Sequence, residues 1–264
     1  MNEFENRVAV VTGGGSGIGQ AMARAFAARS AKVVLADIDA AAMAKTEAEI
    51  SATGAEIASV ETDVRDRESV FALAEATRKA FGGVHIVCNN AGIAPFGPVV
   101  GAEPAEWKIT MDINFWGVVN GVDAFVPRML EHGLGGHIVN TASMAGLTGM
   151  MGLGLYCATK FAVVGLTESL HRELQPRGIG VSVLCPMVVE TNIGEHSQQM
   201  LGKELPAGGT GPLVGNVIQV GEVADRVVRA IEQKDLYILT HPEQREILKR
   251  RAARLDAMFE EGRW

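Results

Sequence analysis

The sequence predicts a single α/β domain built on a doubly wound parallel sheet of about seven strands, with helices on both faces. Short runs of β-branched residues alternate with longer stretches of helical periodicity along the 264 residues, as expected for parallel strands joined by helical crossovers. A Gly-rich turn directly follows the first of these runs. No linker composition and no repeat of fixed period divides the chain, so we expect residues 1–264 to form one domain.

The expected strands are short apolar runs with turn residues on either side. Runs of this length and composition are typical of strands buried on both faces of a parallel sheet. They lie near residues 7 to 12, 32 to 37, 56 to 62, 84 to 89, 136 to 142, 179 to 185 and 236 to 240.

The expected helices fill the intervals between the strands, and several begin with Asp or Glu, which favours a helix N-terminus. Right-handed crossovers would place these helices on both faces of the sheet. They lie near residues 17 to 29, 39 to 53, 66 to 81, 104 to 131, 155 to 175, 221 to 234 and 242 to 260.

Two segments depart from this alternation. Residues 187–220 show no sustained period and exceed the usual limit of about 12 to 15 residues for a structureless loop, so we expect a lid over a binding site. The helix at 242–260 begins at Pro242, which suits a first helical turn. Its apolar stripe would dock on its own domain or on a partner subunit, and consists of Ile247, Leu248, Leu255, Met258 and Phe259.

The composition excludes several classes of protein. A net charge of -7 argues against a nucleic-acid partner, and the basic run at 249–251 is typical of a solvated helix face. No run of about eighteen apolar residues indicates a membrane span. Cys88, Cys157 and Cys185 form no C-x-x-C pair and the N-terminus has no apolar signal region, which favours the cytoplasm. The six histidines fall in no metal-ligand spacing, so we expect no metal.

The Gly-rich turn at 12–19 has the features of a phosphate-binding loop. Gly13, Gly17 and Gly19 form the pattern G-x-x-x-G-x-G. Glycines at such positions let the backbone turn sharply and approach a diphosphate without a Cβ clash. The following helix N-terminus would add N–H donors and a positive dipole end. The sequence therefore predicts a nucleotide site at the end of the first strand.

Asp37 ends the second expected strand. A carboxylate there can accept hydrogen bonds from the adenosine ribose and would repel a 2′-phosphate. The residue before Gly17 is Ser16, and the loop contains no Arg or Lys, so we expect NAD(H) to be favoured over NADP(H). The alternative role for Asp37 or Asp39 is a helix N-cap.

Tyr156 and Lys160 are four residues apart in an expected helix, and Ser143 precedes Tyr156 by thirteen residues. Residues at i and i+4 project from the same helix face. A free phenol has a pKa of about 10, and a neighbouring ammonium stabilises the phenolate, so Tyr156 could exchange a proton with an alcohol or ketone oxygen. Together with the nucleotide site, this pair predicts a hydride-transfer enzyme.

The chain resembles the short-chain dehydrogenase/reductase family over nearly its whole length, with motifs in a highly specific order and spacing. The resemblance implies a Rossmann-like fold, an oxidoreductase and a homodimer or homotetramer. The motifs that carry it are the loop at 12–19, the run Asn89-Asn90-Ala91-Gly92, Asn114, Ser143, Tyr156 and Lys160.

The resemblance also assigns roles to the four catalytic positions. Tyr156 would be the acid and base, and Ser143 would bond the reacting oxygen. Lys160 would hold the nicotinamide ribose as well as lowering the pKa of Tyr156. Asn114 would organise a water that links Lys160 to solvent.

The cofactor contacts expected from the loop, from Asp37 and from the resemblance are distributed over several strand ends. They comprise Gly13, Ser16, Gly17, Ile18, Gly19, Asp37, Ile38, Asp63, Val64, Asn90, Ala91, Gly92, Tyr156, Lys160, Pro186, Val189 and Thr191.

The substrate pocket is expected to be apolar, because the stretch 144–155 contains no charged residue. A bulky secondary alcohol or ketone, aromatic, alicyclic or steroid-like, would suit such a pocket. Met187 replaces the usual Gly of the family and either narrows the substrate site or packs outward. The alternative for the other apolar residues is a place in the core or in a subunit contact. The candidates are Phe96, Met144, Met150, Met187 and Val188.

Two other functions remain open at this point. One is an NADPH-dependent 3-oxoacyl reductase of the same family, which Asp37 disfavours. The other is a non-catalytic nucleotide-binding regulator, because fold alone does not establish activity; it would usually have lost catalytic groups that this sequence retains.

Overall fold

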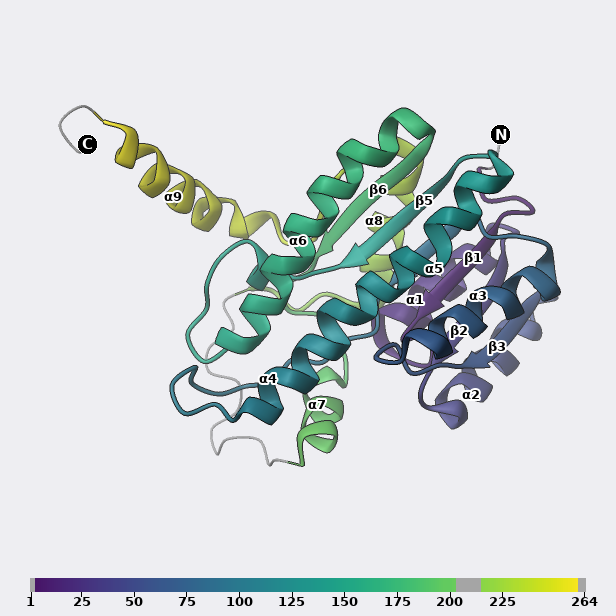
Figure 1. Cartoon of the computed structure of the whole chain (residues 1–264), viewed down its shortest axis with the longest axis horizontal. Helices are drawn as coiled ribbons and strands as arrows, with labels where there is room; N and C mark the ends of the chain where they lie inside the picture. Colours follow the sequence, from purple (N-terminus) through teal and green to yellow (C-terminus); the bar gives the residue numbers. More distant parts are fainter. Residues whose placement is uncertain (1–2, 203–214, 261–264) are drawn as a thin grey trace.

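Residues 3–202 and 215–260 are described in the computed structural model. Its strands form one parallel sheet of the expected kind, in the order β3-β2-β1-β4-β5-β6-β7 (Figure 1). Each strand lies within two residues of its expected bounds, and the doubly wound α/β fold is confirmed. The strands are β1 Val8–Thr12, β2 Lys32–Asp37, β3 Ile57–Glu61, β4 Ile86–Asn89, β5 Gly136–Thr141, β6 Ile179–Cys185 and β7 Tyr237–Leu239.

The helices begin and end where local chemistry favours it. For example, the Asp66 carboxylate accepts a hydrogen bond from the Glu68 amide at the start of α3, and Gly82 ends that helix at φ 85°. The helices are α1 Gly17–Ala27, α2 Ala40–Ser51, α3 Arg67–Phe81, α4 Pro104–Met111, α5 Gly117–His132, α6 Gly154–Leu174, α7 Ile193–Leu201, α8 Val220–Gln233 and α9 Arg245–Asp256.

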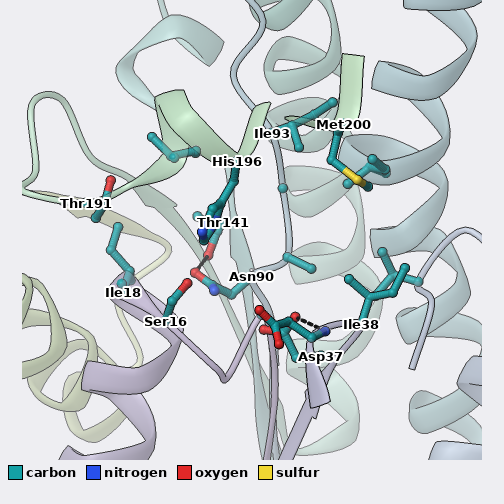
Figure 2. Close-up of a pocket in the computed structure, with 18 of the residues that line it drawn as sticks. Ser16, Ile18, Asp37, Ile38, Asn90, Ile93, Thr141, Thr191, His196 and Met200 are labelled. Atoms are coloured by element: carbon teal, nitrogen blue, oxygen red, sulfur yellow. Dashed lines mark hydrogen bonds between the residues drawn. The ribbon is translucent and has the colours of Figure 1, made fainter. Parts of the chain in front are cut away.

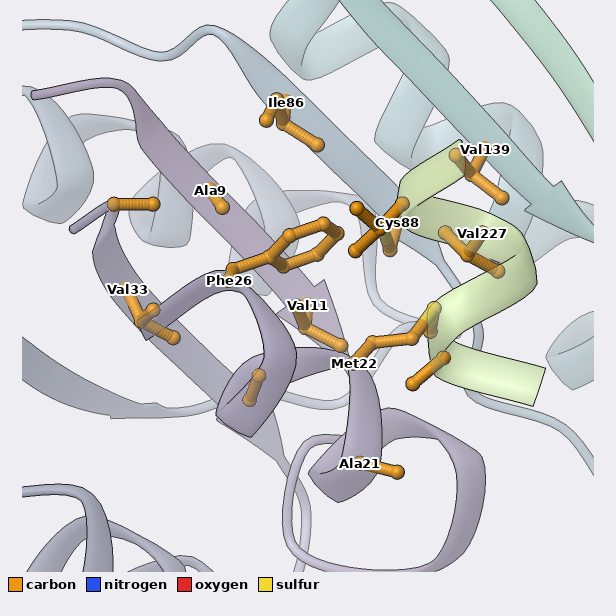
Figure 3. Close-up of a cluster of buried hydrophobic side chains, with 14 of the residues drawn as sticks. Ala9, Val11, Ala21, Met22, Phe26, Val33, Ile86, Cys88, Val139 and Val227 are labelled. Atoms are coloured by element: carbon orange, nitrogen blue, oxygen red, sulfur yellow. The ribbon is translucent and has the colours of Figure 1, made fainter. Parts of the chain in front are cut away.

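Alternate residues of the strands face two separate hydrophobic layers. In β1, Ala9 and Val11 pack with residues of α1 and α8 (Figure 3), whereas Val8 and Val10 pack with residues of α3, α5 and α6. This alternation follows from the strand period of two, and because both faces are covered, nearly every residue of β1 is apolar. The two layers hold the sheet rigidly beneath the loops at its carboxyl edge.

The expected helix at 104–131 differs from the structure in one respect. A π-helical turn, η1 Asp112–Trp116, separates α4 from α5. A single turn of this kind inserts an extra residue into the helix and is frequent at functional sites. Hydrophobic periodicity alone does not reveal it, since the turn adds only one residue to a long apolar pattern.

The segment at 187–220 contains more structure than expected. Helix α7 occupies Ile193–Leu201, and Val189 pairs with Ile218 in an isolated parallel bridge. Periodicity does not predict this helix, because it is short and rich in polar residues. The expected lid also includes residues 203–214, which lie outside the described residues.

The C-terminal segment forms the expected helix, with Pro242 in a 3-10 turn before α9. Figure 1 shows α9 extending away from the body of the molecule. Leu255 and Met258 are about half exposed, at 52% and 49%, so these two residues do not dock on their own domain as one alternative required. Within the described ranges, no helix combines the length and apolar character that a membrane crossing requires.

Candidate active site

The order of the strands reverses between β1 and β4, and a cavity of about 390 Å³ lies at the carboxyl ends of the strands around this point (Figure 2). Ligands of doubly wound sheets bind at such a switch point. The cavity walls come from the loops after six neighbouring strands, β1 to β6, and from α6 and α7. The fold thus brings together residues that are distant in the sequence.

The Gly-rich loop forms one wall of the cavity, and its glycines are sterically required. Gly13 and Gly17 have φ angles of +67° and +52°, which disfavour a side chain. A Cβ at Gly19 would lie 2.0 Å from the Gly13 carbonyl oxygen. Gly19 is not among the residues that line the cavity, and its lack of a side chain lets α1 pack against the loop.

The N-terminus of α1 is open to an anion. Ser16 occupies the N-cap position without a side-chain capping bond, and the first turn of α1 contains no acidic residue. The free N–H groups and the positive end of the helix dipole face the cavity wall that Gly17 and Ile18 form. A diphosphate would fit this wall.

Asp37 holds the loop from the end of β2. Its carboxylate accepts hydrogen bonds from the amides of Gly15, at 3.0 Å, and Asp39, at 3.1 Å. The N-cap of α2 is Asp39, which accepts from the Ala42 amide. The capping role that was open to both residues thus belongs to Asp39, and Asp37 lines the cavity.

The adenosine end expected beyond Asp37 contains an ion pair. The Arg65 guanidinium donates to both carboxylate oxygens of Asp63, at 2.6 to 3.0 Å. This bonding holds the pKa of the Asp63 carboxyl below its usual value and raises that of Arg65. Both side chains line the cavity.

Thr12 connects the loops after β1 and β4. Its hydroxyl accepts from the amides of Asn90 and Ala91, at 2.8 and 3.1 Å, and donates to the Cys88 carbonyl. Asn90 in turn donates to the Thr12 carbonyl and accepts from the Thr141 hydroxyl. These bonds fix the floor of the cavity between the two halves of the sheet.

Tyr156 reaches the cavity from the first turn of α6. Burial raises the pKa of its phenol to about 12, and a hydrogen bond with Ser143 opposes this increase. The Ser143 hydroxyl also accepts from the Ala145 amide at 3.1 Å and donates to the Pro186 carbonyl at 3.3 Å. The serine is therefore held between the ends of β5 and β6.

Lys160 lies one turn further along α6 and is almost completely buried. Its Nζ donates to the Thr141 carbonyl at 2.8 Å and lies 5.6 Å from the centroid of the Tyr156 ring. Burial lowers the pKa of Lys160 to about 8. The expected lowering of the Tyr156 pKa by Lys160 is therefore wrong for this structure: desolvation raises that pKa, and the opposing contribution comes from Ser143.

Asn114 lies in the π-helical turn and is fully buried. Its side chain accepts from the Ile93 amide and donates to the Ile93 carbonyl, both at 2.8 Å, and donates to the Thr159 hydroxyl. A Cβ at Gly92 would lie 3.1 Å from Asn114 Oδ1 and 3.5 Å from Lys160 Nζ. The four expected catalytic residues therefore lie together, with Tyr156 and Lys160 in the cavity wall and Ser143 and Asn114 behind it.

Most of the expected cofactor contacts line the cavity. Val189 does not, because it pairs with Ile218 at the base of the 187–220 segment. The expected residues that do line it are Gly13, Ser16, Gly17, Ile18, Asp37, Ile38, Asp63, Val64, Asn90, Ala91, Gly92, Tyr156, Lys160, Pro186 and Thr191.

The five substrate candidates lie outside this cavity. Phe96 and Met150 pack in a small cluster with Tyr156, whereas Met144 is 1% exposed and belongs to the core. The Met187 side chain lies beside Gly215, since a Cβ at Gly215 would be 3.5 Å from Met187 Cγ. Of the five candidates, Phe96 and Met150 are the two that pack, like Tyr156, against the buried cluster of Ala145, Leu153 and Cys157.

Several residues that line the cavity are not predicted by the sequence. Thr62 and Arg65 follow β3, Thr141 ends β5 and Ile113 lies in the π-helical turn, while the others come from the loop after β4 or from α7 and the residue before it. No motif marks them, because their place depends on how the loops fold together. The additional residues include Thr62, Arg65, Ile93, Ile113, Thr141, Asn192, Ile193, His196, Gln199 and Met200.

A parallel sheet wound in both directions, with an anion-ready loop at its switch point, is the architecture of dinucleotide-binding proteins. Sequence comparison narrows this class, since the family described as short chain dehydrogenase matches residues 7–202. The chain belongs to this family of oxidoreductases.

Individual relatives agree with this assignment. The C alpha-dehydrogenase of Sphingobium sp. is 33% identical over 264 residues, covering 95% of this chain and 85% of the relative. The 1-deoxy-11-beta-hydroxypentalenate dehydrogenase of Streptomyces exfoliatus is 35% identical, covering 92% and 86%. The crystal structure of a short chain dehydrogenase/reductase from Burkholderia phymatum in complex with NAD is 37% identical, with a TM-score of 0.89 and 98% of each chain covered.

Proposed function

We propose that the protein transfers a hydride between NAD(H) and a secondary alcohol or ketone. The observation that carries the proposal is that Tyr156, hydrogen-bonded to Ser143, and Lys160 line one cavity together with the Gly-rich loop and Asp37. Dehydrogenase relatives and a similar structure with bound NAD support it.

The residues present fit a dinucleotide. The N–H groups of α1 would bind the diphosphate, and the Asp37 carboxylate would accept from the adenosine ribose. Lys160, whose Nζ lies beside Gly92 and Thr141, would hold the nicotinamide ribose. When bound, the oxidised cofactor accepts a hydride at its nicotinamide ring and adds a positive charge to this end of the cavity.

In this mechanism the protein supplies orientation and proton transfer. Ser143 holds the substrate oxygen by a hydrogen bond, and Tyr156 Oη accepts the alcohol proton as the carbon loses its hydride and the carbonyl forms. In reduction, Tyr156 returns that proton to the oxygen. A pKa of about 12 keeps the phenol protonated and ready for reduction, and positive charge nearby favours the phenolate that oxidation needs. Asn114 positions the loop after β4 and organises the water that links Lys160 to solvent.

The substrate in this proposal is bulky and apolar. Phe96 and Met150 pack against the same buried cluster as Tyr156 and would give the reacting carbon an apolar surrounding. A relative whose name specifies a hydroxypentalenate substrate is consistent with such a compound. The proposal includes a homodimer or homotetramer in the cytoplasm. The exposed apolar side chains of Leu255 and Met258 support the oligomer, and light scattering of the full chain tests it.

The NADPH-dependent 3-oxoacyl reductase is the second candidate, and Arg65 at the adenosine end is the observation that favours it. The bidentate pair with Asp63, and the Asp37 carboxylate nearby, favour NAD(H) instead.

Steady-state rates with NAD⁺ and NADP⁺ against aliphatic, aromatic, alicyclic and steroidal secondary alcohols, with polyols for comparison, test these proposals. We expect a higher kcat/KM with NAD⁺ and with bulky apolar alcohols. Preference for NADP⁺ would overturn the cofactor assignment, and faster oxidation of polyols would overturn the substrate class. Tight NADH binding without turnover of any alcohol would indicate a non-catalytic nucleotide-binding regulator instead.

A further inference from the structure

Helix α7 is attached beside the cavity at two defined points. The Ala94 amide after β4 donates to Ser197 Oγ at 2.7 Å, and Ser197 is 2% exposed. Just before α7, Thr191 lies against the Gly-rich loop, since a Cβ at Gly17 would be 3.3 Å from Thr191 Cγ2. These contacts determine which face of α7 turns toward the cavity.

That face presents a histidine to the site. Ile193, His196 and Met200 line the cavity at a spacing of three and four residues, which is one face of a helix. Figure 2 shows the His196 ring projecting from α7 into the pocket. The ring lies one turn from the point where Thr191 contacts the Gly-rich loop, because the His196 amide donates to the Asn192 carbonyl.

The other basic side chains of the described cavity wall are already engaged. Arg65 is paired with Asp63 at the expected adenosine end, and Lys160 donates to the Thr141 carbonyl beside Tyr156. The Gly-rich loop itself contains no Lys or Arg. Within the described residues, the His196 imidazole has no hydrogen-bond partner, so its N–H is available to a ligand.

We propose that His196 donates a hydrogen bond to the diphosphate of the dinucleotide, opposite the backbone donors of the Gly-rich loop. The inference rests on the dinucleotide site of the proposed function. A diphosphate bound at the N-terminus of α1 carries more charge than the helix dipole alone offsets. A charge-assisted bond from α7 would complete its coordination and hold α7 over the bound cofactor.

Calorimetric binding of adenosine, AMP, ADP-ribose and NADH to the wild-type protein and to His196→Ala tests this inference. We expect His196→Ala to weaken the binding of ADP-ribose and of NADH by about tenfold each, which corresponds to the loss of one hydrogen bond to a charged group. Adenosine affinity stays unchanged, because adenosine lacks the diphosphate. His196→Lys restores most of the affinity for ADP-ribose.

Glu195→Gln is the matched control, since it alters the neighbouring position of α7 that does not line the cavity; its affinities stay within about twofold of wild type. Equal weakening of adenosine and ADP-ribose by His196→Ala would show that the residue only places α7. Weaker binding of NADH alone would assign His196 to the nicotinamide or substrate end of the site and overturn the proposal. Unchanged affinity for every ligand would also overturn it. If none of the ligands binds the wild-type protein, the dinucleotide site itself is wrong.

Discussion

At the scale of single residues, the site combines a buried phenol and a buried amine whose pKa values move in opposite directions. Burial favours the neutral form of each group, so it raises the pKa of Tyr156 to about 12 and lowers that of Lys160 to about 8. Groups with pKa values shifted in this way are frequent at functional sites, because catalysis needs ionisable groups in buried positions that disfavour their charged forms.

Replacing Tyr156 with Phe removes the proton acceptor and leaves the aromatic packing in place. We expect turnover to fall by about a thousandfold or more, the usual contribution of acid–base catalysis, while the Kd for NADH changes by less than about twofold. Single-turnover rates and NADH fluorescence titration measure the two quantities. A variant that keeps a tenth of the wild-type rate would contradict the assignment.

Replacing Lys160 with Met should stabilise the fold while abolishing turnover. The unfolded chain has the ordinary pKa of 10.5 and the folded chain about 8, so the cost of burying the charge is full below pH 8 and disappears as the pH rises to 10.5. We expect Lys160→Met to raise the free energy of unfolding by about 2 kcal/mol at pH 7, with the loss of the bond to Thr141 limiting the gain. Urea denaturation at pH 7 and pH 10 provides the measurement, and a lower stability at pH 7 would argue against a buried charge.

At the scale of elements, the base of the 187–220 segment is tied to the start of the C-terminal segment. His241 is buried, and its Nε2 lies 3.2 Å from the Val188 carbonyl and 2.8 Å from the Asn216 carbonyl. The amides of Glu190 and Ile218 complete this base with backbone bonds to the Ile218 and Val188 carbonyls. The His241 imidazole therefore joins the two ends of the 187–220 segment.

His241→Leu removes this donor and leaves two carbonyls without it. We expect the amides of Glu190 and Ile218 to exchange with deuterium about tenfold faster. The two ends of the segment would separate at a lower free-energy cost, reduced by roughly the contribution of one hydrogen bond. His132→Leu is the control, since His132 bonds the Val84 carbonyl elsewhere in the fold. Equal acceleration in both variants would indicate general destabilisation instead of a local clamp.

At the scale of the whole molecule, the fold disfavours the charged form of two histidines, His137 and His85. His137 on β5 is 4% exposed and bonds Ser182 through Nε2, and burial lowers its pKa to about 4. Burial likewise lowers the pKa of the half-buried His85 to about 4. In the unfolded chain both return to 6.5.

Global stability should therefore decrease in mild acid. The contribution of these two neutral histidines to the free energy of unfolding is complete above pH 6.5. It is lost as the pH falls from 6.5 toward 4, because only the unfolded chain binds protons at these histidines in that range. His137 alone contributes a slope of up to about 1.4 kcal/mol per pH unit. Urea denaturation at pH 7, 6 and 5 measures it. His137→Gln should reduce the slope even if the variant is less stable overall, and an unchanged slope would refute the contribution of this residue.

By itself, the sequence determined the class of fold, the seven strands, the glycine pattern and the spacing of Ser143, Tyr156 and Lys160. Local signals suffice for these features: periodicity marks strands and helices, and a positive φ angle demands glycine. The membership of the family follows from the same motifs.

The tertiary structure alone decided which residues meet at the cavity. The π-helical turn at Asn114, the pair of Arg65 with Asp63, and the approach of His196 on α7 all depend on loops folded against one another. The direction of the Tyr156 pKa belongs here too, since spacing predicts a neighbouring ammonium but desolvation depends on the surrounding atoms. Contacts and burial between distant segments carry no local signal, and the folded chain is needed to define them.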